Sequence, residues 1–155
     1  TLSFAGCDNI LDILKEMKEE KGKNYFDNLF CTQVVPSYED LSLPLVREYR
    51  ELMDEYKSKI PVFSDEICSK TRKYGFVSLE GFINAKVFVE VLKRCGRDLT
   101  PQRFMQTIET DGIFDIGMGQ MIKFGPGKHQ GLDVVYCMTV KDEKWVPIEH
   151  NPCNM

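Results

Sequence analysis

A chain of 155 residues with 43% hydrophobic content is long enough for one domain with a real core, and its formal net charge is −4. The acidic balance argues against a nucleic-acid partner, because such sites gather Lys and Arg on one face. No run reaches the roughly eighteen apolar residues of a membrane helix, and the first residues lack the basic start of a secretion signal. Because the chain begins at Thr1, we expect it to have been trimmed, cleaved or expressed as a fragment.

The first third of the chain predicts a helix and then a strand. The apolar residues that recur at helical spacing are Ile10, Leu11, Ile13, Leu14 and Met17. Asp8 or Asn9 is the natural N-cap of this helix, and Gly22 should end it. Residues 29–35 have the composition of a strand, which Pro36 ends.

A second helix is predicted to begin at Asp40 or Ser42 and to run to about Lys59. Residues 60–75 mix charged, Ser and Thr residues without a clear period. We interpret them as a connection that contains one short helix turn.

Two more helices follow this connection. Ser78 can cap the first, whose apolar residues Phe82, Ala85, Val89 and Leu92 recur at helical spacing. Gly96 should end it, Thr100 and Pro101 should open the next, and that helix should end near Thr110.

The end of the chain has the pattern of β-structure. A Gly-rich passage, 112–131, holds one predicted strand at 120–124. Residues 133–140 and 145–148 flank the charged turn 141–144, and together they predict a hairpin.

Six cysteines could pair in fifteen ways, so the count alone shows no disulfide framework. Cys31 and Cys137 lie in strand-like apolar runs, and we interpret both as free, buried thiols. No CxxC pair occurs and the chain has two histidines, so neither a structural zinc site nor any other cofactor is expected. A Cys-His nucleophile is a weaker hypothesis, because His129 lies in the loop sequence GPGKHQG and nothing brings a thiol to it.

Four segments in order carry a family resemblance: FAGCDNILD, FCTQVVPSYEDLSLPLVREYRELM, VSLEGFINAKVFVEVLKRCGRDLT and FDIGMGQMIKFGPGKHQGLDVVYCMTVKDEKWVPI. The chain resembles the C-terminal part of type I periplasmic solute-binding proteins, the leucine/isoleucine/valine-binding family of ABC importers. Residues 60–75 depart from the family pattern as a long, charged insertion.

The resemblance implies an α/β fold with two lobes, joined by crossover segments, in which helices are followed by a C-terminal β-hairpin. Residues 1–31 and 121–155 would be parts of the second lobe, and 32–120 part of the first lobe with crossover segments. The segments 32–37 and 117–131 are expected to flex when the lobes close. The N-terminal portion of the parent protein is expected to be absent, so the specificity loops that would identify the ligand are absent with it.

Asp8 is the first candidate ligand-binding residue. In relatives that bind amino acids, an acidic residue shortly after a Gly on the second lobe pairs with the ligand's ammonium group, and Gly6-Cys7-Asp8 matches that position. A carboxylate in a closing cleft forms charge-assisted hydrogen bonds with such a group. The alternative is that Asp8 only caps the helix that follows it.

Phe76, Ser78 and Glu80 match the place where the first lobe of relatives presents an aromatic and polar groups to the cleft. An aromatic wall would bury an apolar ligand side chain, and the start of the helix would favour an anionic group. The alternative is that Phe76 is a core residue and Ser78 a plain N-cap.

The resemblance implies no enzyme activity. It implies an extracytoplasmic solute-binding component of an ABC importer, periplasmic or extracellular and with a lipoprotein anchor as one option. This component would bind an amino acid or related small carboxylate and meet a membrane permease. The alternative is the ligand-sensing domain of a membrane signalling receptor. As a fragment, the chain is expected to self-associate through surface that a missing half would cover.

Overall fold

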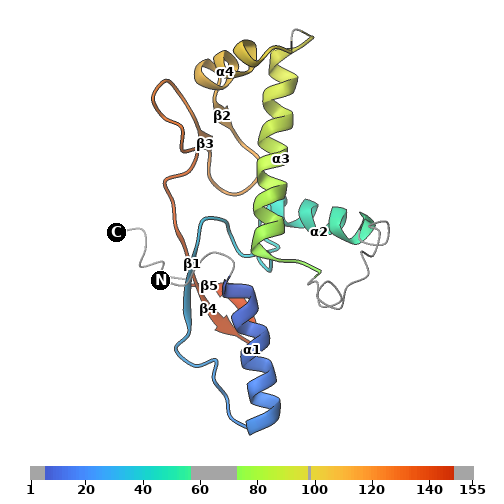
Figure 1. Cartoon of the computed structure of the whole chain (residues 1–155), viewed down its shortest axis with the longest axis vertical. Coiled ribbons are helices and arrows are strands. Elements are labelled where there is room, and N and C mark those ends of the chain that lie inside the picture. Colours follow the sequence, from blue (N-terminus) through green and yellow to red (C-terminus); the bar gives the residue numbers. More distant parts are fainter. Residues whose placement is uncertain (1–5, 57–72, 98, 149–155) are drawn as a thin grey trace.

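The computed structural model describes residues 6–56, 73–97 and 99–148. In these ranges the elements are α1 (Gly6–Lys21), β1 (Phe30–Gln33), α2 (Pro44–Tyr56), α3 (Phe76–Cys95), α4 (Pro101–Thr110), β2 (Ile113–Phe114), β3 (Ile122–Lys123), β4 (Tyr136–Lys141) and β5 (Lys144–Pro147). As Figure 1 shows, α1 and the strands β1, β4 and β5 lie at one end, α4, β2 and β3 lie at the other, and α3 runs between them. The mixed helix and strand content, ending in a hairpin, confirms the predicted fold class.

The larger sheet has the strand order β1-β4-β5, and its neighbouring strands are antiparallel. The predicted hairpin is β4-β5, whose register pairs Lys141 with Lys144. Its two turn residues, Asp142 and Glu143, have φ values of 51° and 59°, as a two-residue turn that follows the twist of the strands requires. The hairpin was therefore predicted correctly without the Asn-Gly pair that usually marks such a turn.

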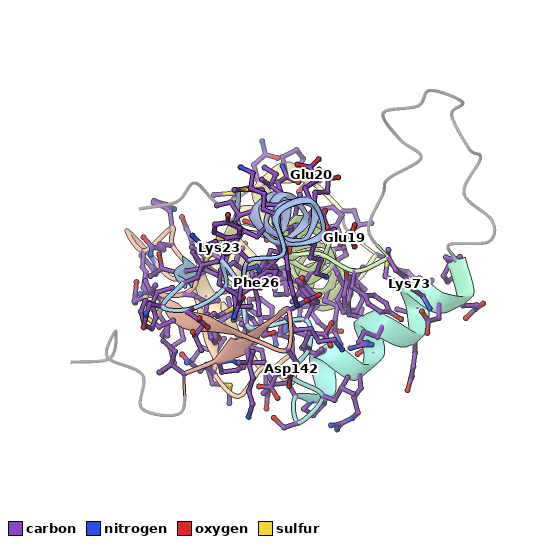
Figure 2. The ribbon with its side chains drawn as sticks, turned by 90° about the horizontal axis from the view of Figure 1, so that it is seen from below. Glu19, Glu20, Lys23, Phe26, Lys73 and Asp142 are labelled. Atoms are coloured by element: carbon purple, nitrogen blue, oxygen red, sulfur yellow. A yellow bond between two sulfur atoms is a disulfide. The ribbon has the colours of Figure 1, made fainter. Side chains whose placement is uncertain are left out.

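α1 packs its apolar side against this sheet and leaves its charged side in solvent. Cys7, Leu11 and Trp145 are almost completely buried here, and Phe26 joins them from the loop before β1. Figure 2 shows Glu19 and Glu20 at the outer surface of the helix. Lys18 Nζ lies 2.5 Å from Glu143 Oε1, so the last turn of α1 also meets the hairpin turn. Gly22, at φ 65°, ends the helix as predicted.

α3 buries a different face from the one its sequence suggested. Its buried residues are Phe76, Leu79, Ile83, Val87, Val91 and Cys95. The predicted apolar stripe is offset from this one, and in it Ala85 is exposed and Val89 is 45% exposed. Two apolar stripes compete on this helix, and only the structure shows which one faces the core.

The predicted ends of α3 and α4 are confirmed apart from one cap. Gly96 ends α3 with φ 71°, and the Thr100 hydroxyl accepts the Arg103 N–H at 3.1 Å at the start of α4. The predicted cap at Ser78 is wrong, because α3 begins at Phe76 with Gly75 as its N-cap residue. The start of α3 is set by a partner outside the helix, which local sequence does not reveal.

α2 begins at Pro44, two residues after the predicted Ser42, and the loop before it meets a second loop. The Leu45 N–H donates to the Gly117 carbonyl at 3.0 Å. Gly117 has φ 81°, and a Cβ there would lie 3.1 Å from Cβ of Pro44, so both the turn and the close approach favour glycine. The start of α2 is thus joined to the loop 115–121, which overlaps the segment 117–131 that is expected to flex when the lobes close.

Other expectations are corrected or stay untested. The predicted strand at 120–124 is shorter and pairs with β2, which the sequence did not predict. The predicted end of the second helix at Lys59 and the helix turn within 60–75 fall outside the described residues, except for 73–75. Among the described helices, none is both long enough and apolar enough to cross a membrane.

Candidate functional site

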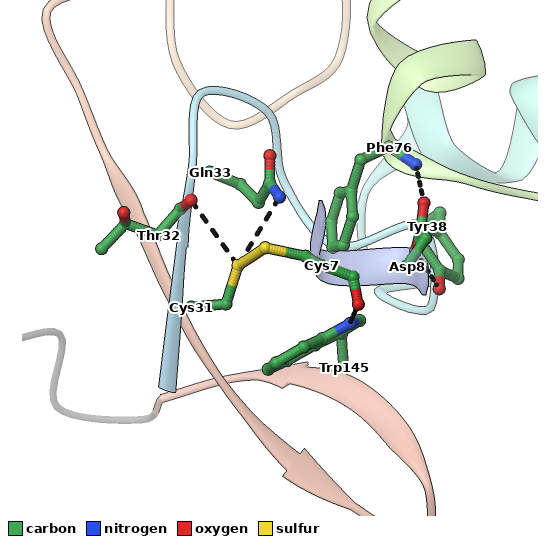
Figure 3. Close-up of a disulfide and its surroundings, with 8 residues drawn as sticks. All are labelled: Cys7, Asp8, Cys31, Thr32, Gln33, Tyr38, Phe76 and Trp145. Atoms are coloured by element: carbon green, nitrogen blue, oxygen red, sulfur yellow. Dashed lines mark hydrogen bonds between the residues drawn. A yellow bond between two sulfur atoms is a disulfide. The ribbon is translucent and has the colours of Figure 1, made fainter. Parts of the chain in front are cut away.

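Asp8 lies in the first turn of α1, and its carboxylate points toward α3. Oδ2 accepts the Phe76 N–H at 2.9 Å, and Oδ1 accepts the Tyr38 hydroxyl at 2.9 Å (Figure 3). We call Asp8, Tyr38 and Phe76 the Asp8 junction. Because α1 already begins at Gly6, Asp8 is not its N-cap residue, and that structural expectation is wrong. The carboxylate instead caps the start of α3.

The residue before Asp8 is fixed by a disulfide bond. Cys7 and Cys31 are bonded and both side chains are buried, which ties the start of α1 to β1. The Trp145 indole N–H also donates to the Cys7 carbonyl at 3.0 Å. Both contacts are drawn in Figure 3. They hold the backbone beside Asp8 against the larger sheet.

The expectation that Cys31 and Cys137 are free thiols is wrong. Cys31 pairs with Cys7, and Cys137 is also disulfide-bonded. A strand-like apolar context suits a buried half-cystine as well as a buried thiol, so the sequence pattern could not separate the two. Among the described residues, Cys95 is the free cysteine, and its thiol lies 3.4 Å from the Thr107 hydroxyl.

Phe76 takes part in the Asp8 junction through its backbone N–H. Its side chain is completely buried, and its ring makes an edge-to-face contact with Tyr38 at a centroid distance of 4.9 Å. An edge-to-face pair of aromatic rings stabilises a fold by more than the burial of its apolar surface does. In the described part of the chain the ring is a core group, while the N–H at the helix start serves the Asp8 carboxylate.

Ser78 belongs to a second hydrogen-bonded group that adjoins the junction. Its hydroxyl donates to the Gly75 carbonyl at 3.1 Å and lies 2.6 Å from the Tyr49 hydroxyl, which accepts the Gly75 N–H at 3.1 Å. Burial raises the pKa of Tyr49 above its ordinary value, although the hydrogen bond with Ser78 acts in the opposite direction. α2 thereby holds the loop from which α3 starts.

Glu80 is the candidate that the structure does not bring into these contacts. It lies partly buried on α3, and its side chain takes no part in the hydrogen bonds around Gly75. Of the four candidates, Asp8, Phe76 and Ser78 therefore meet around Gly75. Tyr38 and Tyr49 were missed by sequence reasoning, and the usable signal was that a buried Tyr needs a partner for its hydroxyl.

Hollows lie elsewhere on the described surface, one of them beside the end of α3 and the start of α4, where Cys95, Arg97 and Arg103 line it. A cavity of about 230 Å³ lies between the loops that contain Ser37 and Gly119 and the strand residue Tyr136. A groove of about 360 Å³ between α2 and α3 is lined by Leu52, Phe82, Ala85 and Val89 together with charged residues at its rim. None of the four candidates lines these hollows. The Asp8 junction is a joint between α1, the loop before α2 and the start of α3.

The Cys-His hypothesis gains no support from the described residues. His129 is exposed in its loop, as expected, whereas the Cys95 thiol is buried against α4. No group of three or more His, Cys, Asp or Glu side chains in the described ranges could hold a metal ion.

Two solved structures share the fold of this chain. One is a possible leucine/isoleucine/valine-binding protein from Rhodopirellula baltica SH 1, with a TM-score of 0.62 and 31% sequence identity, over 77% of this chain and 29% of that one. The other is a substrate-binding periplasmic protein from Ralstonia solanacearum, with a TM-score of 0.61 and 17% identity, over 88% of this chain and 41% of that one. This chain therefore spans less than half the length of either protein.

Comparisons by sequence give no further relatives. No protein-family profile matches the chain, and no curated protein sequence matches it.

Proposed function

The chain has the fold of part of a type I periplasmic binding protein, and on that premise we propose that it belongs to a receptor that binds an amino acid or related small carboxylate between two lobes. The receptor would deliver this solute to the permease of an ABC importer, and no chemical step would take place. The observation that carries the proposal is the likeness to the Rhodopirellula baltica protein, at 31% identity over 77% of this chain.

The domain division proposed for the chain follows the same fold. Residues 1–31 and 121–155 would belong to the second lobe, and 32–120 to the first lobe and the crossovers. In support, α1 packs with the β1-β4-β5 sheet at one end of the molecule, whereas α3 and α4 lie toward the other (Figure 1). Strand β3, at 122–123, is the exception, because it pairs with β2 at the α4 end. The contact between Gly117 and Leu45 at the start of α2 would then lie at the hinge.

Asp8 is the proposed partner of the ligand's ammonium group. Its carboxylate lies where α1 meets the start of α3, which would be the inner edge of the cleft between the lobes. Ser78 and Glu80, on the first two turns of α3, would face the same cleft from the other lobe. The buried ring of Phe76 would support this edge from the core.

A periplasmic or extracellular location fits the disulfide chemistry. The Cys7–Cys31 bond and the bonded Cys137 belong to an oxidising compartment, since cytosolic thiols are kept reduced. One of the two similar structures is also described as a periplasmic protein.

Titration calorimetry of the receptor that contains this chain tests the proposal. Saturable binding of an amino acid is expected, and Asp8→Asn should weaken it about ten- to a hundredfold, as for the loss of a hydrogen bond to a charged group. Glu19→Gln, on the exposed side of α1, is the matched control and should leave the affinity unchanged. Equal affinity in the wild type and Asp8→Asn would reject Asp8 as the ammonium partner, and no binding to any amino acid would reject the solute class.

A further inference from the structure

The start of α3 is capped from a distant part of the chain. Gly75, the N-cap residue, has no side chain with which to satisfy the exposed N–H groups of the first turn. The Phe76 N–H is instead satisfied by Asp8, 68 positions away. A charged acceptor at the positive end of a helix makes this a stronger contact than an ordinary neutral hydrogen bond.

Gly75 leaves room here for the Asp8 carboxylate. A Cβ on Gly75 would lie 3.0 Å from Asp8 Oδ2, a tight contact that would push the carboxylate away slightly. Gly75 has φ −166°, an extended conformation that any residue adopts, so backbone strain gives no reason for glycine at this position. The room beside Gly75 thus allows Asp8 to reach the helix.

The Asp8 end of the contact is held from three directions. The Tyr38 hydroxyl donates to Oδ1, and the Tyr38 ring packs on Phe76. The neighbouring Cys7 is fixed by its disulfide and by Trp145. These contacts hold the carboxylate in one position.

We infer that the Asp8 junction is a latch that ties α1 to α3. The latch sets how the part that holds α1 and the β1-β4-β5 sheet approaches the part that holds α3 and α4. The inference rests on the proposed function: in a receptor the latch would link the two lobes without ligand and favour the closed arrangement. Tyr38 and Gly75 then act as positioning residues for a carboxylate that also meets the ligand. Substitutions at these two residues would alter the affinity for the ligand, because they would change the fraction of receptor molecules in the conformation that binds it.

Amide hydrogen exchange at Phe76 in the 155-residue protein, without ligand, tests the latch directly. Asp8→Ala should speed exchange of this amide at least about tenfold, since a hydrogen bond to a charged group is lost. Gly75→Ala should also speed this exchange, by a smaller factor, because the added methyl group pushes on the carboxylate. Tyr38→Phe keeps the ring contact but removes the hydroxyl that orients the Asp8 carboxylate, and it should raise the rate less, about fivefold, because the Phe76 N–H keeps its acceptor. Glu19→Ala is the control and should change nothing.

The amides of Ile83 and Val87, deep in α3, report whether each variant stays folded. The latch is overturned if Phe76 exchanges at the wild-type rate in Gly75→Ala and Tyr38→Phe while these interior amides stay protected. If Asp8→Ala loses interior protection, the other two variants decide the matter. Because no ligand is present, this result is independent of the calorimetry that tests solute binding.

Discussion

The hydroxyl of Tyr49 on α2 lies 2.6 Å from the hydroxyl of Ser78 on α3, and both bind the backbone of Gly75. Tyr49 is completely buried, whereas Ser78 reaches the surface. The same glycine leaves room for Asp8. One residue thus receives contacts from α2, from the first turn of α3 and from α1.

Replacing Tyr49 by Phe should lower the free energy of unfolding by about 1–3 kcal/mol, because the buried Gly75 N–H loses its acceptor. Urea denaturation followed by circular dichroism measures this change. Tyr25→Phe, which removes the hydroxyl of a partly exposed loop residue, is the control and should fall within about 0.5 kcal/mol of the wild type. Equal stability of Tyr49→Phe and Tyr25→Phe would mean that the hydroxyl does not hold the loop.

Alkaline pH should act through the same side chain. Burial raises the pKa of Tyr49 above its ordinary value of 10.0, so the folded state holds the phenolic proton more tightly than the unfolded state does. This contribution is fully present below the unfolded pKa and is lost as the pH rises through the folded one. Stability should therefore fall above about pH 10, and the fall should be smaller in Tyr49→Phe.

Melting temperatures recorded between neutral pH and pH 11 provide the measurement, with phenolate absorbance as a parallel signal. Tyr136, whose pKa is also raised by burial, contributes in the same direction. The double variant Tyr49→Phe/Tyr136→Phe should therefore show the flattest profile. A profile as steep as that of the wild type would count against both assignments.

Local signals in the sequence were sufficient for elements whose ends are set by their own residues. Thr100 with Pro101, Gly96 and the hairpin turn each carry their capping or turn chemistry within a few positions. The start of α3 could not be predicted in the same way, because its cap is Asp8. Long-range partners of this kind leave no periodic trace in one sequence.

The disulfide is a second case in which the sequence was insufficient. Cys7 and Cys31 are 24 positions apart, and nothing in their neighbours favours this pairing over the others. The resemblance placed Asp8 and Phe76 near a common cleft but did not indicate that they touch. Only the fold reveals that α1 and α3 meet at these residues.

Loss of the Cys7–Cys31 bond should destabilise the protein by about 3 kcal/mol, because the closed loop restricts the unfolded chain. The double variant Cys7→Ser/Cys31→Ser can be compared with the wild type by urea denaturation. Trp145, the single tryptophan, packs beside Cys7 and should report the loosening by its fluorescence. If a reductant shifts the midpoint of the double variant as much as that of the wild type, the effect belongs to another bond.

The 155-residue chain on its own should bind amino acids weakly or not at all. It spans 29% and 41% of the two similar binding proteins, and the first-lobe loops that would complete the cleft are expected to lie outside it. Calorimetry with leucine, isoleucine, valine and glutamate tests this. Micromolar affinity for any of them would show that these residues already form a complete site.

Self-association of the 155-residue chain should use the groove between α2 and α3. Leu52, Phe82, Ala85 and Val89 line its floor, and the ion pairs Lys86–Glu48 and Lys93–Glu90 border it. Val89 is 45% exposed, and an apolar strip of this kind is typical of a surface that another chain covers. We expect Val89→Glu to raise the dissociation constant of the self-associated form at least about tenfold, because a charge would have to be buried there.

Light scattering at increasing protein concentration measures this shift. Val135→Glu, at a residue that is 40% exposed in the segment before β4, is the matched control and should self-associate like the wild type. Equal weakening by both substitutions would indicate a general effect of added negative charge. A wild-type protein that stays monomeric at high concentration would exclude the groove as a contact surface between copies of this chain.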